Sequence, residues 1–372
     1  MAVSVRGILE EEAGVLILDA SGRVVDRAAS CAGPSYPRNP PMRAHRGLVL
    51  IVGTDEWDHQ RRRRRQRLRV LDPATGAVSL LPHHGDDDGT VSFFVLGWAA
   101  AASASTGSQG GGSAGGYYKV ISITDDGDHH GASVQLSCKV LTLGAGVWRE
   151  VQKPPATVRR EHACVAAVAA GVVYVLALRP RVNKTDWIAA FDLETEQWRP
   201  GLLRGPRTSN ALSCLTTNTD GHLVAVSGSF SYASSVDLWL LVGGGDGWGK
   251  REAVWQKMCT VPMGVERTRR RRSHLEEQEQ LVAEPQPLWV LNGGKAAFLV
   301  WSPVTVKGRL AGTCSATGMV THPNWVLHVY DPRSSKPFQH FARRFWYSTD
   351  VAVGVYNKNN LLRVQGVHSE LF

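Results

Sequence analysis

One phrase recurs through the chain at a spacing of about fifty residues. It consists of an apolar alternating run, a turn, and a bulky residue after the turn. Residues 188–200 read IAAFDLETEQWRP, and related phrases occur at 68–82, 138–151 and 326–338. A repeat of this kind restricts the fold more than any single residue does, because each copy must form the same supersecondary unit.

Aligning the phrases defines one module: a strand, a glycine-containing turn, a second strand, a variable connection, and a third strand that ends in the phrase. The closing tryptophans Trp148, Trp198 and Trp248 lie fifty residues apart, and Val78 takes the same place in the first copy. The longer step from Val78 to Trp148 contains the Ala/Ser/Gly stretch 99–116, which we expect to be a low-complexity loop insertion. Five copies are traced, at residues 46–82, 93–152, 163–203, 212–258 and 288–341.

A fifty-residue period is typical of β-propeller blades of the kelch type. The 38 glycines and 12 tryptophans suit a turn-rich all-β chain, since glycine supplies turn conformations and aromatic side chains cover pleated surfaces. A single module cannot bury both faces of its sheet, so blades stack radially and cover one another. In this arrangement Trp148, Trp198 and Trp248 are structural wedges between blades.

Closing the ring requires one further sheet, and both ends of the chain offer strands for it. Residues 15–25 and 351–364 each read as a hairpin. We therefore predict an all-β, β-propeller-like fold with kelch-type blades of about fifty residues. Residues 1–372 form one domain, and six blades are closed by strands from both termini.

The positive charge of the chain is concentrated in two arginine runs. The net charge is +9, but the arginines of segments 61–69 and 267–272 number twelve, so the rest of the chain carries about −3. We expect exposed loops here, the second within a charged insertion at 263–284, with nuclear targeting or an acidic partner as functional readings. Nucleic acid is disfavoured because the runs lack interleaved aromatic residues. The candidates are Arg61, Arg62, Arg63, Arg64, Arg65, Arg269, Arg270, Arg271 and Arg272.

The cysteine content and the N-terminal residues indicate a cytoplasmic or nuclear protein. Six scattered cysteines without a CxxC pair suit a reducing compartment, and the N-terminal residues lack the pattern of a secretory signal. The uncharged run 163–178 is too short to cross a bilayer, which takes about 20 residues. A turn at Ala170 and Gly171 divides this run, so we predict a buried hairpin and no membrane association.

No segment predicts a cofactor, a metal or a catalytic group. The sequence GGGDGWGKR at 243–251 resembles a phosphate loop, but Arg251 stands where serine or threonine would bind magnesium. The His/Asp tracts at 83–89 and 125–131 could supply metal ligands, yet both are predicted to be solvated loops. No GxSxG or HExxH motif occurs, so we expect no enzyme, although an active site assembled from distant loops stays open.

The module phrases resemble the F-box-associated domain of plant F-box proteins. Four features match that family's pattern in order: Asp72-Pro73-Ala74-Thr75, Tyr118-Lys119-Val120, Val140 to Trp148, and Phe191 to Trp198. The resemblance covers roughly residues 46–260 and departs from the pattern at Asp72, where the family has asparagine. It implies a substrate-binding module of a Skp and cullin ubiquitin ligase.

Residues 1–40 do not resemble the leucine-rich helices with which an F-box grips the Skp adaptor. They contain a predicted strand hairpin and the proline-rich stretch GPSYPRNPPM. The sequence therefore predicts a protein-interaction module, either a ubiquitin-ligase substrate receptor or a truncated relative of one. The alternative is a propeller hydrolase with its active site in the central channel.

Overall fold

The computed structural model contains only strands, turns and irregular segments in the residues that it describes, so the all-β prediction is confirmed. The described residues are 2–5, 14–18, 24–28, 43–54, 66–84, 92–100, 116–125, 136–159, 166–178, 182, 184–218, 220–228, 235–243, 253–262, 286–290, 296–301, 304–309, 317–322, 324–333, 338–346 and 351–352.

Five consecutive antiparallel sheets coincide with the five modules predicted from the sequence. Their first strands are β4 (Arg43–His45), β8 (Ser92–Ala100), β12 (Ala166–Ala169), β17 (Leu212–Thr217) and β21 (Gln286–Val290). The second strands are β5 (Leu48–Thr54), β9 (Gly116–Asp125), β13 (Val172–Leu176), β18 (Leu223–Ser227) and β22 (Ala296–Trp301).

The third and fourth strands complete each sheet. The third strands are β6 (Gln66–Leu71), β10 (Leu136–Thr142), β14 (Trp187–Asp192), β19 (Ser235–Gly243) and β25 (Asn324–Tyr330). The fourth are β7 (Val78–Leu80), β11 (Trp148–Glu150), β15 (Gln197–Trp198), β20 (Val254–Pro262) and β26 (Phe338–Trp346). β16 (Leu203–Arg204) also pairs with β14, and the hairpin of β23 (Val304–Arg309) and β24 (Thr317–His322) lies between β22 and β25.

A further sheet joins strands from the two ends of the chain. β1 (Ala2–Val5), β2 (Gly14–Leu18) and β3 (Val24–Ala28) pair in sequence, and β27 (Val351–Ala352) pairs with β1. The predicted N-terminal hairpin is thus present as β2 and β3. Of the predicted C-terminal hairpin, residues 353–364 lie outside the described residues.

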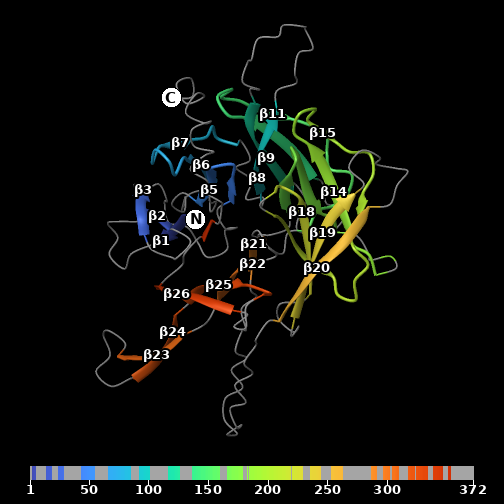
Figure 1. The fold of residues 1–372 in the computed structure, drawn as a ribbon. Coiled ribbons are helices and arrows are strands. Elements are labelled where there is room, and N and C mark those ends of the chain that lie inside the picture. The colour runs from blue at the N-terminus through green and yellow to red at the C-terminus, as the bar shows by residue number, and fades with distance from the viewer. Residues whose placement is uncertain are drawn as a thin grey trace, which may run out of the picture.

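The sheets follow one another in the order of the chain (Figure 1). Their first strands are in successive contact: β4 with β8, β8 with β12, β12 with β17, and β17 with β21. Separate hydrophobic cores lie between consecutive sheets. The sheets therefore pack face to face, with the first strand of each sheet next to the first strand of the following one.

Central strands are buried on both faces, which explains why they read as continuous apolar runs rather than as alternating ones. In β13, Val173 and Val175 pack in the core shared with the preceding sheet, whereas Tyr174 and Leu176 pack in the core shared with the following one. β12 and β13 also confirm the hairpin predicted for 163–178. Its turn residues Ala170 and Gly171 have φ values of 48° and 75°, as a type I′ turn requires.

Candidate functional site

The repeated phrase builds the same hairpin at the end of the third strand in successive sheets, with Asp72 and Asp192 at this end in two copies and Thr142 in the copy between them. The register pairs Leu71 with Val78, Leu141 with Trp148, and Phe191 with Trp198. Val78, Trp148 and Trp198 are therefore equivalent, as the fifty-residue spacing predicted.

The aspartate that ends the third strand fixes the turn through its side chain. Asp192 Oδ1 accepts hydrogen bonds from the backbone N–H groups of Glu194 (3.0 Å) and Thr195 (3.1 Å). Asp72 likewise accepts from Ala74 N (2.8 Å), and Asp331 accepts from Arg333 N (3.0 Å). Aspartate commonly stabilises a turn by such contacts to the backbone two residues on. The aspartate of the phrase is thus explained by turn formation.

Glu196 occupies a turn position at which the two preceding sheets have glycine. Its φ is 57°, and the equivalent residues Gly76 and Gly146 both have a φ of 72°. The left-handed region is unfavourable for a residue with a Cβ atom. Contacts of the Glu196 side chain can offset this cost.

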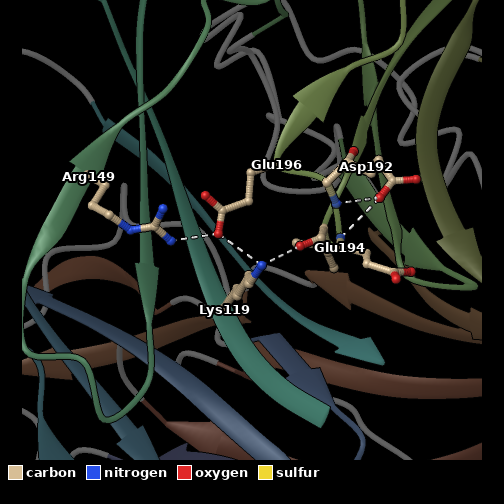
Figure 2. Close-up of polar contacts among 7 residues, drawn as sticks. Lys119, Arg149, Asp192, Glu194 and Glu196 are labelled. Atoms are coloured by element: carbon tan, nitrogen blue, oxygen red, sulfur yellow. Dashed lines mark hydrogen bonds and ion pairs between the residues drawn. The ribbon is translucent and has the colours of Figure 1, made fainter. Parts of the chain in front are cut away.

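Those contacts form a small charged cluster between two sheets, drawn in Figure 2. Glu196 Oε1 lies 2.9 Å from Lys119 Nζ and 2.6 Å from a guanidinium nitrogen of Arg149. Lys119 Nζ also donates to the carbonyl oxygen of Leu193 at 2.5 Å. Lys119 and Arg149 belong to β9 and β11 of one sheet, whereas Leu193 and Glu196 belong to the β14–β15 turn of the next. The cluster thus joins neighbouring sheets.

Shape complementarity accompanies this charge contact. Gly97 of β8 lies against Leu193, and a Cβ atom built at Gly97 would be 2.5 Å from Leu193 Cδ1. The absence of a side chain at Gly97 therefore lets the β14–β15 turn approach the preceding sheet. Lys119 is buried, Glu196 is largely covered, and Arg149 is exposed.

Because Glu196 can take up a proton, the free energy of unfolding should depend on pH. Burial alone would raise the pKa of Glu196, but hydrogen bonds and ion pairs with Arg149 and Lys119 outweigh burial, so its pKa lies below the usual 4.5. Because the pKa is lowered in the folded state, the ion pairs of Glu196 stabilise the fold fully above the unfolded-state pKa of about 4.5. This stabilisation is lost as pH falls through the folded-state pKa.

We expect Glu196→Gln to lower the free energy of unfolding by about 1–3 kcal/mol at pH 7, because the buried Lys119 loses its carboxylate but keeps its hydrogen bond to Leu193 O. The difference from wild type should shrink as pH falls below about 4.5 in urea titrations. Glu194→Gln, an exposed carboxylate of the same turn, serves as the control and should show neither effect. A difference between wild type and Glu196→Gln that does not change with pH would contradict the charge argument.

A second buried charge pair joins the next two sheets. Asp186 is 1% exposed, and its Oδ1 lies 2.7 Å from a guanidinium nitrogen of Arg159. Asp186 Oδ2 accepts the backbone N–H of Leu212 in β17 at 2.9 Å, and Arg159 donates to the carbonyl oxygen of Leu212 at 2.7 Å. Carboxylate and guanidinium together therefore bind both backbone groups of one residue in the following sheet.

Two of the three tryptophans that the sequence singles out lie at cores between sheets. Trp148 packs against the core between its own sheet and the preceding one, and Trp198 packs in the equivalent core of the next sheet. Trp248 lies outside the described residues. In its sheet Trp255 of β20 donates its Nε1–H to Arg204 O at 2.8 Å, much as Trp148 donates to Pro82 O at 3.0 Å.

Three titratable side chains, Cys138, Tyr118 and His45, have pKa values shifted toward their neutral forms by burial. Burial raises the pKa of the Cys138 thiol to about 12, partly offset by the neighbouring Trp198 indole, and burial raises the pKa of Tyr118 to about 12. Burial and the nearby Arg46 lower the pKa of His45 to about 4. These side chains are suited to packing.

The other predicted segments lie mostly outside the described residues. These include both arginine candidates, Arg61–Arg65 and Arg269–Arg272, the insertion at 101–115, residues 244–251 of the glycine-rich loop, and most of the His/Asp tracts. Arg67 and Arg69, counted with the first run, belong to strand β6. Within the described ranges, no group of three His, Cys, Asp or Glu side chains could hold a metal ion, and no helix could span a membrane.

The sequence did not predict an ion pair for Lys119, Glu196, Asp186 or Arg159, although Lys119 and Glu196 lie in the stretches that resemble the F-box-associated domain. Two signals were available. Lys119 is a lysine within an apolar strand, and alignment of the phrases places Glu196 at a position that is glycine in two other copies.

Among known proteins, the chain is similar only to solved structures, and this similarity is weak. No family model matches the chain, and no curated protein does. The β-propeller domain of the Trilobed protease from Pyrococcus furiosus is 10% identical, with 61% of this chain and 54% of that chain covered and a TM-score of 0.29. The tricorn protease is 11% identical, with coverage of 88% and 28% and a TM-score of 0.34. Dipeptidyl peptidase 4 of Porphyromonas gingivalis is 8% identical, with coverage of 91% and 51% and a TM-score of 0.34. The chain thus spans between 28% and 54% of the length of these proteins.

Proposed function

We propose that the six larger sheets form a six-bladed β-propeller closed by the sheet that both chain ends share. Three observations support this. The first strands of five sheets contact one another in succession, separate cores lie between consecutive sheets, and β27 pairs with β1. A propeller buries both faces of every blade by such stacking.

The proposed propeller acts as a protein-interaction module of the F-box-associated or kelch type, in the cytoplasm or the nucleus. The observation that carries this proposal is the contrast between constant hairpins and variable connections. The third-to-fourth-strand hairpin keeps one register in three sheets, whereas the connection between first and second strands in the same sheets comprises residues 46–47, 101–115 and 170–171, and so differs widely in length. Variable loops on a rigid scaffold are the usual carriers of binding specificity.

The described charge clusters form contacts between sheets. Lys119 and Arg149 share the carboxylate of Glu196, and Arg159 pairs with Asp186 at the next junction. The rival function, a propeller hydrolase, requires His, Asp or Glu side chains that converge in the central channel.

Affinity purification of the full chain from cell extract, with quantitative mass spectrometry, tests the proposal. We expect a stoichiometric protein partner that is captured by wild type and not by an unfolded core variant. We also expect no Skp or cullin protein, because residues 1–40 lack F-box-like apolar periodicity. Stoichiometric recovery of Skp and cullin would instead establish the ligase role. Hydrolysis of ester, lactone or peptide substrates by the purified chain, with no partner captured, would overturn the binding function.

A further inference from the structure

β20 is an outer strand that is long for its place in the sheet. The outer strands β7, β11 and β15 of the preceding sheets span three, three and two residues, whereas β20 and β26 each span nine. Side chains are described for β20, which is yellow to orange in Figure 1. Among the described strands, β20 pairs with β19 alone, so its other edge presents backbone N–H and C=O groups to which a further strand can add.

Apolar side chains of β20 would suit such an addition. Val254 is 55% exposed, and Trp255 is only partly buried where it packs against the core shared with the preceding sheet. Met258 and Cys259 are partly buried against the core shared with the following sheet. Two copies of one strand have equal lengths and can pair antiparallel about a twofold axis, so a second copy of the chain is the occupant that this edge fits most simply.

Three features of β20 nevertheless oppose this pairing. Met258 is an extra residue in the register with β19, and such a bulge bends a strand and increases its twist. Lys257 places a charge near the middle of the strand, and Pro262 ends the strand with a residue that has no N–H. Bulges, lysine and proline are features by which natural sheets protect their edges from association.

Contacts within the sheet hold Lys257 beside the edge. Its Nζ lies 2.8 Å from Asp237 Oδ1 and 5.8 Å from the centroid of the Trp239 ring, and its side chain is 44% exposed. A strand added to β20 would cover part of the exposed ammonium group, at a cost in free energy. An antiparallel pair of β20 strands would also bring the two copies of Lys257 close together, and like charges across a strand pair are destabilising.

We propose that β20 is an edge able to pair with a second copy of this chain, and that the bulge at Met258, the charge of Lys257 and Pro262 keep it unpaired. The chain is therefore a monomer, although this sheet ends in a long outer strand. This role is separate from the proposed function, because it concerns the outer edge of a sheet and not the connections between strands.

Sedimentation velocity of the full chain over a range of concentrations tests the proposal. We expect wild type to stay monomeric, and the weight-average mass of Lys257→Val/Pro262→Val to rise with concentration toward about twice that of the monomer. The matched control is Lys153→Val/Pro155→Val, which removes the same charge and one proline at exposed residues of the β11–β12 connection and should stay monomeric. Adding Gln256→Lys, at an exposed position of β20, to Lys257→Val/Pro262→Val should restore the monomer.

Four results would overturn the proposal. A wild-type chain that already dimerises would show that these features do not keep the edge unpaired. A Lys257→Val/Pro262→Val variant that is folded by circular dichroism and stays monomeric would show that the edge does not pair. Equal association of Lys153→Val/Pro155→Val would assign the effect to exposed valine at any site, and association that persists with Gln256→Lys would assign it to another strand. Lys257→Thr alone, which should dimerise more weakly, decides the question if the double variant is unfolded.

Discussion

Replacement of Asp186 by alanine is expected to lower the free energy of unfolding by about 3–5 kcal/mol. The change leaves the Arg159 guanidinium, itself largely buried, without its carboxylate, and it leaves the Leu212 N–H in β17 without its acceptor. Removing one partner of a buried ion pair is costly because the other charge stays out of water. Urea unfolding followed by circular dichroism measures the loss.

Asp192→Ala is the matched control for Asp186→Ala. Asp192 is also an aspartate that accepts two hydrogen bonds, but its contacts stay within its own sheet and its ion pair with Arg199 is long, at 3.5 Å, so about 1 kcal/mol is expected. Asp186→Asn should lie between the two alanine variants, because an amide oxygen can still accept from Leu212 N while the charge is lost. Equal losses for Asp186→Ala and Asp192→Ala would mean that the Arg159 pair does not stabilise the junction between sheets.

The five sheets that coincide with the modules could be predicted from the sequence because each depends on contacts within one module. The turn residues, the apolar strand runs and the fifty-residue period all lie within about sixty residues of chain. The equivalence of Val78, Trp148 and Trp198 followed from this period and is confirmed by the strand register. Local patterns of this kind specify strand and turn strongly.

The charge clusters could not be predicted because they depend on how one sheet meets the next. Lys119 and Glu196 are 77 positions apart in the sequence, and their contact requires the β14–β15 turn to reach β9 of the preceding sheet. Asp186 looks like an ordinary loop aspartate until Arg159 and Leu212 are placed beside it. Ion pairs of this type depend on how neighbouring sheets pack, and the periodicity of the sequence does not predict them.

The charge clusters and the apolar cores act at the same junctions. Phe191 and Trp198 come from the sheet whose turn carries Glu196, and they pack in the core shared with the sheet that carries Lys119. The Lys119–Glu196 ion pair lies at the edge of the interface between these two sheets, and the apolar core lies at its centre. Burial at the centre should therefore contribute more stability than the ion pair at the edge does.

Phe191→Ala is accordingly expected to destabilise the chain by about 3–5 kcal/mol, more than any change at Glu196. Phe191 is fully buried, and its ring meets the Trp198 indole edge-on at a centroid distance of 5.1 Å. Truncation leaves a cavity that neighbouring sheets cannot fill, since their backbones are fixed by ladder hydrogen bonds.

The repeat supplies an internal comparison for Phe191→Ala. Leu141 stands at the equivalent register position and is also buried, in the core shared with the preceding sheet, so Leu141→Ala should cost about 2–5 kcal/mol. Val147→Ala, at a 65% exposed turn position, should change stability by no more than about 0.5 kcal/mol. Unfolding is best followed by circular dichroism, because the loss of Phe191 alters the surroundings of Trp198 and hence its fluorescence. If Leu141→Ala behaved like Val147→Ala while Phe191→Ala did not, the modules would share a sequence pattern without sharing a mode of packing.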